Sequence, residues 1–244
     1  ENFTSISEKM KPEELVDFIN KYLSFMTSIV LEHRGTLDKY LGDSLMAFWG
    51  APLEVENKEL LACETALLMQ EKIKNLQTSS ASNSSSQIRT RIGIHSDDVV
   101  VGNIGGQERF DYTVMGDGVN LASRLEGANK MYGTSIMISE ATYEQVKENV
   151  LVRIIDRIVV KGKTKPITVY ELVGLNNNIE DENKLERIKD YTNGYNSYIE
   201  RDFNSAKLYF EKSVEKNPSD KLSQLYLERS NNYIENPPPK DWNG

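Results

Sequence analysis

Residues 111–126, Asp-Tyr-Thr-Val-Met-Gly-Asp-Gly-Val-Asn-Leu-Ala-Ser-Arg-Leu-Glu, predict a strand that runs directly into a helix. The strand is expected over residues 110–115, and Gly116 separates it from the helix. Asp117 is expected to be the helix N-cap, because its short carboxylate can accept hydrogen bonds from the amides of the first turn. The helix then continues to about Met131.

The predicted helix places Asn120 and Arg124 on one face, since they are four residues apart. An amide and a guanidinium near the positive end of a helix suit a phosphate or a developing oxyanion. Taken alone, the pair fits an ordinary solvent-exposed helix face as well.

Strands and helices alternate irregularly on either side of this stretch, which predicts an α+β fold with a mixed sheet. Helices are expected over residues 12–33, 57–76 and 140–148. Strands are expected over residues 36–40, 45–49, 88–95, 98–104, 134–138, 151–161 and 166–173. The Ser- and Asn-rich residues 78–87 are expected to form a surface loop.

The composition excludes several classes of protein. Of the 244 residues, 39% are hydrophobic and 27% are charged, which rules out disorder over the whole length. The net charge of −8 argues against a nucleic-acid-binding protein. The single cysteine, Cys63, cannot form a disulfide within the chain, and no apolar run is long enough to span a membrane. These features favour a cytoplasmic domain.

Three further motifs carry charge or precede a helix. Lys39-Tyr40-Leu41-Gly42-Asp43 places a cation and a carboxylate around a tight turn, although a plain surface hairpin has the same pattern. Val160-Lys161-Gly162-Lys163 puts two lysines at a hairpin tip, where protection of an edge strand is the simpler explanation. Phe3-Thr4 precedes the first helix and by itself indicates no function.

In their order and spacing, these motifs together resemble the catalytic domain of the class III nucleotidyl cyclases, the adenylate and guanylate cyclase family. The last part of the family's opening motif, Asp-Ile-x-x-Phe-Thr, is similar to residues 3–8. Its second metal motif resembles residues 39–52, its central strands residues 91–95 and 99–104, and its transition-state helix residues 111–126. The resemblance covers about residues 1–174. It implies a mixed sheet flanked by helices, related to ferredoxin-like folds, with the first strand truncated.

The resemblance implies phosphoryl transfer, in which the ribose 3′-hydroxyl of a nucleoside triphosphate attacks its own α-phosphorus and pyrophosphate leaves. Two divalent ions, Mg²⁺ or Mn²⁺, are implied as cofactors, because hard cations bind carboxylate oxygens. The implied roles are metal binding by Asp43, ribose orientation and charge stabilisation by Asn120 and Arg124, and triphosphate binding by Lys161 and the backbone amides of Phe3 and Thr4.

The resemblance also assigns purine recognition to Lys39 and Thr113. A lysine only donates hydrogen bonds, so it suits N1 of adenine, which accepts, and not N1 of guanine, which donates. The Thr113 hydroxyl can accept a hydrogen bond from the adenine amino group. ATP is therefore the expected substrate and cyclic AMP the expected product, as in bacterial-type adenylate cyclases. Guanylate cyclase activity and a catalytically silent, dimerising or nucleotide-binding module are the alternatives.

In this family the active site lies between two subunits, so a homodimer with two equivalent sites is expected. The family's first metal aspartate would lie two positions before Glu1, and the chain is therefore expected to be a poorly active fragment of a longer parent. Upstream sensor and membrane segments are common in such parents, so the parent could be membrane-anchored. Asp97 stands where the family usually has glycine, and it adds charge and restricts the backbone. His95 is expected to be structural.

The domains are expected to be a cyclase domain over residues 1–175, a polar linker over 176–184 and a helical extension over 185–244. One repeat cannot bury both of its faces, so the extension is expected to pack on the cyclase domain or on a partner. The extension resembles a tetratricopeptide-type helix pair through Gly194, Ala206, Phe210 and Pro218, but departs from it at Ser197 and Ser213.

Overall fold

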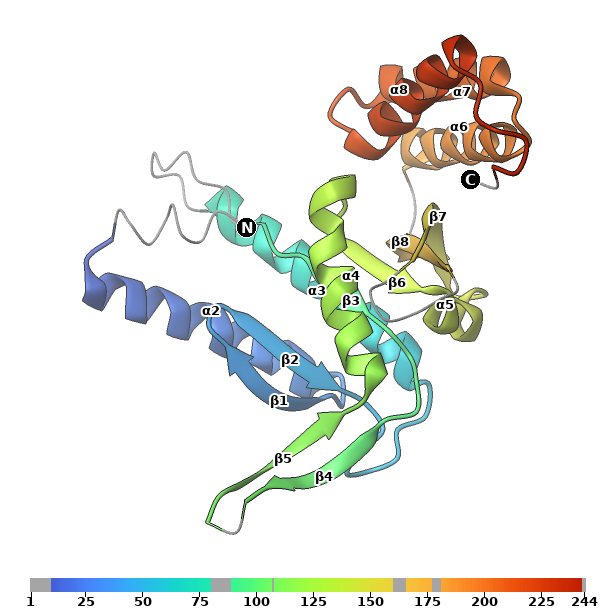
Figure 1. Cartoon of the computed structure of the whole chain (residues 1–244). Helices are drawn as coiled ribbons and strands as arrows, with labels where there is room; N and C mark the ends of the chain where they lie inside the picture. The colour runs from blue at the N-terminus through green and yellow to red at the C-terminus, as the bar shows by residue number, and fades with distance from the viewer. Residues whose placement is uncertain (1–9, 80–88, 107, 160–165, 177–180, 243–244) are drawn as a thin grey trace.

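The computed structural model describes residues 10–79, 89–106, 108–159, 166–176 and 181–242. Figure 1 shows the arrangement of the elements. The helices are α2 (Pro12–Glu32), α3 (Lys58–Ser79), α4 (Asp117–Tyr132), α5 (Glu140–Val146), α6 (Glu182–Ile199), α7 (Phe203–Lys216) and α8 (Lys221–Glu235). The strands are β1 (Thr36–Leu41), β2 (Ser44–Phe48), β3 (Ile92–Ile94), β4 (Val100–Gly105), β5 (Phe110–Met115), β6 (Ile136–Ser139), β7 (Val150–Ile158) and β8 (Ile167–Leu175).

The predicted mixed sheet is confirmed. Its four strands lie in the order β3-β6-β8-β7, with β3 and β6 parallel and the other pairs antiparallel. Side chains alternate across this sheet. Met137 packs with residues of α4, whereas Ile136 and Ile138 pack with residues of α3 and α5. The sheet is therefore covered by α4 on one face and by α3 and α5 on the other.

Two antiparallel hairpins, β1–β2 and β4–β5, form separate two-stranded sheets. In Figure 1 the β4–β5 hairpin projects away from the central sheet, and β5 leads directly into α4. Figure 1 also shows the β1–β2 hairpin beside α2. The apolar faces of α2 and α3 meet around Met26, Ile29, Val30, Met69 and Ile73. Among the described helices, none has the length and apolar character needed to cross a membrane.

Several predicted boundaries were wrong. The N-cap of α4 is Gly116, at φ 152°, so Asp117 is the first residue of the helix and not its N-cap. A backbone at that φ favours glycine, and Asp117 instead places its negative charge in the first turn. The strand expected over 88–95 is confined to Ile92–Ile94 within the described residues, and α5 ends at Val146. Helix α6 begins at Glu182, inside the segment predicted as a linker.

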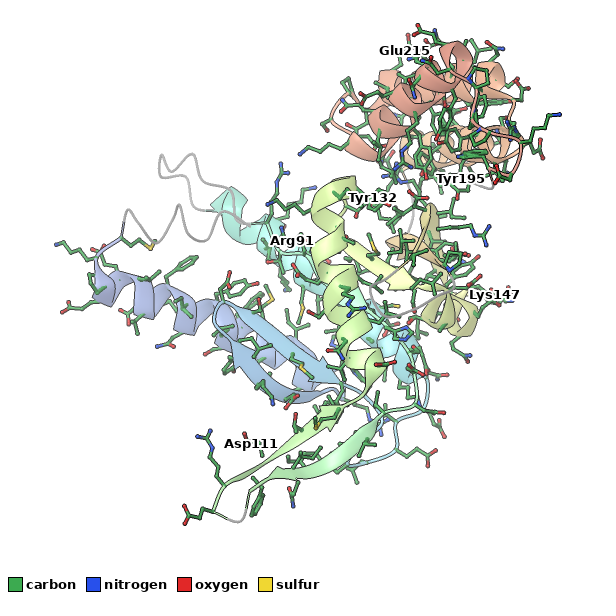
Figure 2. All side chains as sticks on the ribbon, viewed as in Figure 1. Arg91, Asp111, Tyr132, Lys147, Tyr195 and Glu215 are labelled. Carbon is green, nitrogen blue, oxygen red and sulfur yellow. The ribbon has the colours of Figure 1, made fainter. Side chains whose placement is uncertain are left out.

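Of the C-terminal helices, α6 packs against β7 and α8 against the end of α4, whereas α7 packs on α6 and α8. Figure 2 shows Tyr132 at the end of α4 that faces these helices, with Tyr195 on the side of α6 nearest to it. The Tyr132 hydroxyl donates to Asp156 of β7 at 2.9 Å, and Arg229 of α8 bonds the same carboxylate at 2.9 Å. The Tyr226 hydroxyl donates to the carbonyl of Ile155 at 2.7 Å. The extension therefore packs on the preceding α+β domain, one of the two expected arrangements.

Ser213 departs from the tetratricopeptide pattern for a reason that the packing supplies. Its side chain is buried and lies 2.9 Å from the Ser223 hydroxyl, which donates to Asp220 at 2.7 Å. A larger apolar residue would leave these buried polar groups without that hydrogen bond. Gly194 is small because Phe210 lies against it, as the pattern predicts. The assignment to the tetratricopeptide class stays a prediction.

Helix α4 is fixed to β3 by a buried asparagine and a close glycine contact. The Asn129 amide donates to the carbonyl of Ile92 at 3.0 Å and accepts from the Thr134 hydroxyl at 2.8 Å. A Cβ added to Gly93 would lie 2.2 Å from the carbonyl oxygen of Ala122 in α4. The strand and the helix therefore approach each other as closely as two backbones allow.

Gly93→Ala is expected to destabilise the fold by about 2–3 kcal/mol, because a rigid backbone must move away from the new methyl group. The measurement is urea unfolding followed by circular dichroism. Gly127→Ala, in the interior of α4, is the matched control, since nothing lies within 4 Å of the added Cβ. That variant is expected to gain about 0.5–1 kcal/mol through reduced backbone entropy. Equal stability of the two variants would contradict the close approach of β3 and α4.

Candidate active site

The two predicted purine-recognition residues lie on neighbouring strands, and one carboxylate links them. Thr113 is on β5, only 7% exposed, and its hydroxyl donates to Oδ2 of Asp38 on β1 at 2.9 Å. Lys39 follows Asp38, and its Nζ is 3.7 Å from the other carboxylate oxygen, Oδ1. The structure thus brings Lys39 and Thr113 together from positions far apart in the sequence.

A β-bulge creates this arrangement. In the β1–β2 ladder Leu37 pairs with Ala47 and Lys39 with Met46, so Asp38 is the extra, unpaired residue. A bulge redirects side chains locally, and bulges are frequent beside active sites. The Asp38 side chain is 1% exposed. Its Oδ1 has no hydrogen-bond partner among the described residues, so the Lys39 ammonium at 3.7 Å balances the charge without a direct hydrogen bond.

Asp43 lies at the tip of the β1–β2 hairpin, inside the tight turn that it was predicted to flank. Leu41 pairs with Ser44, which leaves a two-residue turn of Gly42 and Asp43. Gly42 has φ 66°, a left-handed conformation that favours glycine at the first turn position. Asp43 is exposed, and its negative charge interacts with the Tyr22 hydroxyl of α2. Burial raises the pKa of the Tyr22 hydroxyl, its hydrogen bond to Thr90 acts in the opposite direction, and the Asp43 charge raises that pKa further.

An exposed carboxylate at a turn has the right chemistry for one ligand of a hard divalent cation. Within the described residues, however, no group of three or more His, Cys, Asp or Glu side chains could hold a metal ion. Asp43 therefore fits as one metal ligand, and the described part of the chain supplies no complete metal site.

Asn120 and Arg124 are both on the exposed face of α4, whereas Leu121 and Leu125 on the other face are buried. The predicted juxtaposition on one helical face is therefore confirmed. The burial of Leu121 and Leu125 against the sheet fixes the direction in which the exposed face points. Lys161, Phe3 and Thr4, the predicted triphosphate-binding residues, lie outside the described residues.

His95 and Asp97 occupy the segment between β3 and β4. A ring nitrogen of His95, Nδ1, lies 2.7 Å from the Ser139 hydroxyl, and Nε2 lies 3.6 Å from a carboxylate oxygen of Asp97. Asp97 packs against Gly118 at the start of α4, where a Cβ on Gly118 would lie 2.7 Å from the Asp97 Cβ. An aspartate at position 97 is thus accommodated by a glycine opposite it.

A hollow of about 500 Å³ lies beside Lys39, between β1 and β5. It is lined by Asp38, Lys39, Tyr40, Arg109, Phe110, Asp111 and Tyr112. Large apolar side chains are exposed on the same hairpins, among them Val100, Phe110, Tyr112 and Met115 on β4–β5. Figure 2 shows the acidic Asp111 on this projecting β5 strand. Exposed apolar side chains gathered on one element mark an interaction surface.

Sequence reasoning missed Asp38 entirely. It is separated from Thr113 by 75 residues, and it lies beside Lys39 in a strand of mixed polar and apolar residues. In a regular strand, alternation would place Asp38 on the face opposite Leu37 and Leu41, so no local pattern indicated a buried interaction. The partner could be identified only from the packing of β1 against β5.

Residues 1–174 match a family model described as the adenylate and guanylate cyclase catalytic domain. Adenylate cyclase 1 of Rhizobium meliloti is 40% identical over 174 residues, which make up 71% of this chain and 26% of that protein. The chain spans between 11% and 34% of the lengths of the first curated relatives that it matches.

Two solved structures share the fold. The adenylyl cyclase CyaB from P. aeruginosa superposes with a TM-score of 0.66 at 34% identity, over 73% of this chain and 91% of that one. The guanylyl cyclase Cya2 gives a TM-score of 0.65 at 31% identity, over 73% and 90% of the two chains. Because the family model matches residues 1–174, well over half of the chain, the chain belongs to the adenylate and guanylate cyclase catalytic domain family.

Proposed function

We propose that this chain is the catalytic domain of an adenylate cyclase, which converts ATP to 3′,5′-cyclic AMP and pyrophosphate. The observation that supports this substrate best is the pairing of Lys39 and Thr113 through Asp38. A donor-only ammonium beside a hydroxyl oxygen matches the N1 and amino edge of adenine. Membership of the cyclase family supports the reaction type.

The reaction needs groups that position the substrate and neutralise charge. The oxygen of the ribose 3′-hydroxyl forms a bond to the α-phosphorus, and the bond from that phosphorus to the oxygen bridging to the β-phosphate breaks. In this proposal Asn120 orients the ribose, and Arg124 stabilises the charge that develops on the α-phosphoryl oxygens. Both side chains project from the exposed face of α4, which leaves them accessible to a substrate.

Asp43 would hold a divalent ion, Mg²⁺ or Mn²⁺, as one of two in the complete site. Such ions, when bound, neutralise triphosphate charge and favour loss of the 3′-hydroxyl proton. Lys161 and the amides of Phe3 and Thr4 are proposed to bind the triphosphate. The reaction uses ATP, so we place the domain in the cytoplasm.

We further propose that the active enzyme is a homodimer, in which Asp43 and Lys161 of one subunit face Lys39, Thr113, Asn120 and Arg124 of the other. The exposed apolar side chains of the β4–β5 hairpin support this, because a second copy would remove them from water. A closed two-fold arrangement would then contain two identical sites.

The direct test is cyclic nucleotide formation by the full-length gene product with Mn²⁺ and either ATP or GTP. We expect cyclic AMP from ATP, with a kcat/KM at least tenfold above that for GTP. Comparable rates with both nucleotides would support a guanylate or unselective cyclase. Binding of ATP without any turnover would support a silent regulatory module instead.

A further inference from the structure

We propose that Asp38 determines the choice of adenine over guanine by fixing the direction of the Thr113 hydroxyl. This inference rests on the proposed function and concerns the same site. A threonine hydroxyl is ambiguous as a recognition element, because it carries one donor hydrogen and also accepts through its lone pairs. By itself it could accept from the adenine amino group or donate to guanine O6.

The contact with Asp38 removes this ambiguity. The Thr113 hydroxyl donates its hydrogen to Asp38 Oδ2 at 2.9 Å. A carboxylate only accepts hydrogen bonds, so the hydrogen stays directed toward it and the Thr113 oxygen is left as an acceptor for the base. An acceptor suits the adenine amino group and repels guanine O6, which is also an acceptor.

The setting of Asp38 keeps the hydroxyl in this direction. The side chain is 1% exposed, so water does not compete for the Thr113 hydrogen. Asp38 is the unpaired residue of the β1 bulge. Its backbone is therefore not held in register with β2, as those of Leu37 and Lys39 are. A buried carboxylate is costly unless it is paired and hydrogen-bonded, and here the Lys39 ammonium lies 3.7 Å from its second oxygen.

The same carboxylate also positions Lys39. Its attraction holds the ammonium on the side of β1 that faces Thr113, although Lys39 itself is 40% exposed. One buried acidic group thus organises both parts of the base-reading pair: a donor aimed at N1 and an acceptor aimed at the 6-position. Asp38 is a positioning residue, since it acts on the base through its two neighbours.

The experiment compares ATP, GTP and inosine triphosphate as substrates of the full-length gene product. Inosine triphosphate has the 6-oxygen of guanine but lacks its 2-amino group, so it isolates the contacts at N1 and the 6-position. In Asp38→Asn the amide can turn either its carbonyl or its amino group toward Thr113, and the hydroxyl can then donate to a 6-oxygen. The preference for ATP over both other nucleotides is expected to fall at least about tenfold.

Three comparisons separate this role from a structural one. Thr113→Val removes the hydroxyl, and Asp38→Asn in that background is expected to change the nucleotide preference by less than it does in the wild type, because only its effect through Lys39 remains. Asp38→Glu retains a charged acceptor and is expected to keep the preference for ATP. Asp17→Asn, on the exposed surface of α2, removes the same charge elsewhere and is expected to leave every rate unchanged.

An unchanged ratio of ATP to GTP turnover in a folded Asp38→Asn enzyme would overturn the inference while leaving the cyclase proposal intact. Equal turnover of inosine triphosphate and ATP by the wild-type enzyme would also overturn the inference. If Asp38→Asn does not fold, Thr113→Val must lower the preference by itself, and its failure to do so is equally decisive. Absence of any turnover or nucleotide binding by the wild type would refute the proposed function, and this inference with it.

Discussion

Arg124→Ala and Asp43→Asn are each expected to lower kcat for cyclic AMP formation by about 10²–10³-fold. Arg124 lies on the exposed face of α4 and is proposed to stabilise charge in the transition state, where a single donor has an effect of this size. Asp43 at the β1–β2 turn is proposed to hold the metal ion. The measurement is cyclic AMP production at saturating ATP and Mn²⁺.

Mixing the two inactive variants is expected to restore about a quarter of the wild-type activity. Random association makes half of the dimers mixed, and in a mixed dimer one of the two sites receives both wild-type side chains. Asn120→Ala mixed with Arg124→Ala is the matched control, because both residues come from the same subunit at each site. That mixture is expected to stay inactive. Recovery in the control, or none in the first mixture, would rule out the shared homodimeric site.

Asp220→Asn is expected to lower the free energy of unfolding by about 3 kcal/mol at neutral pH. Asp220 forms hydrogen-bonded ion pairs with Arg153 of β7 and with Arg187 of α6, at 3.1 Å from Nη2 of Arg153 and 3.0 Å from Nη1 of Arg187. The Arg153 side chain is 5% exposed and also pairs with Glu171 at 2.7 Å. Removing one partner leaves a buried charge less well compensated, which is more costly than loss of the pair itself.

The same variant is expected to change how stability depends on pH. Burial raises the pKa of Asp220, but its hydrogen bond and charge interaction with Arg153, helped by Ser223 and Arg187, hold it below its usual value. A carboxyl group with a lower pKa in the folded state stabilises the fold above its unfolded pKa of about 3.9. This contribution is lost as the pH falls through the folded pKa. The difference between wild type and Asp220→Asn should therefore be largest near neutral pH and shrink below about pH 4.

Glu211→Gln is the control for both measurements. Glu211 pairs with Lys207 at 3.9 Å on the surface of α7, and both side chains are exposed. Such a pair contributes less than about 1 kcal/mol, so the variant should match the wild type in urea unfolding. A destabilisation of Asp220→Asn no larger than that of Glu211→Gln would contradict the importance of the buried ion pairs for docking the helical extension.

Most of the fold could be predicted because its signals are local. The apolar spacing of α2 and the glycine turn between β1 and β2 depend on a few neighbouring residues. The strand-to-helix passage through Gly116 is equally local, although the capping prediction at Asp117 was wrong. Propensity alone could not show that a glycine with φ 152° would take the cap position.

The candidate site likewise contains residues that local sequence patterns predict and one residue that only the tertiary structure reveals. Asn120 and Arg124 share a face because a helix has a fixed period, and the sequence is sufficient to show it. Asp38 could not be found, because its role depends on a bulge and on a strand 75 residues away. Sequence reasoning therefore identified the residues proposed to read the base but not the residue proposed to set their directions.

The sequence by itself determined the family, the local elements and the order of the motifs, since short-range periodicity and turn chemistry are written in adjacent residues. Only the tertiary structure decided which distant groups meet: Asp38 with Thr113, Asn129 with the carbonyl of Ile92, and Asp220 with Arg153. The physical reason is that a buried polar group must find its hydrogen-bond partner wherever chain packing places one. That partner is set by the whole arrangement of sheet and helices and by no local pattern.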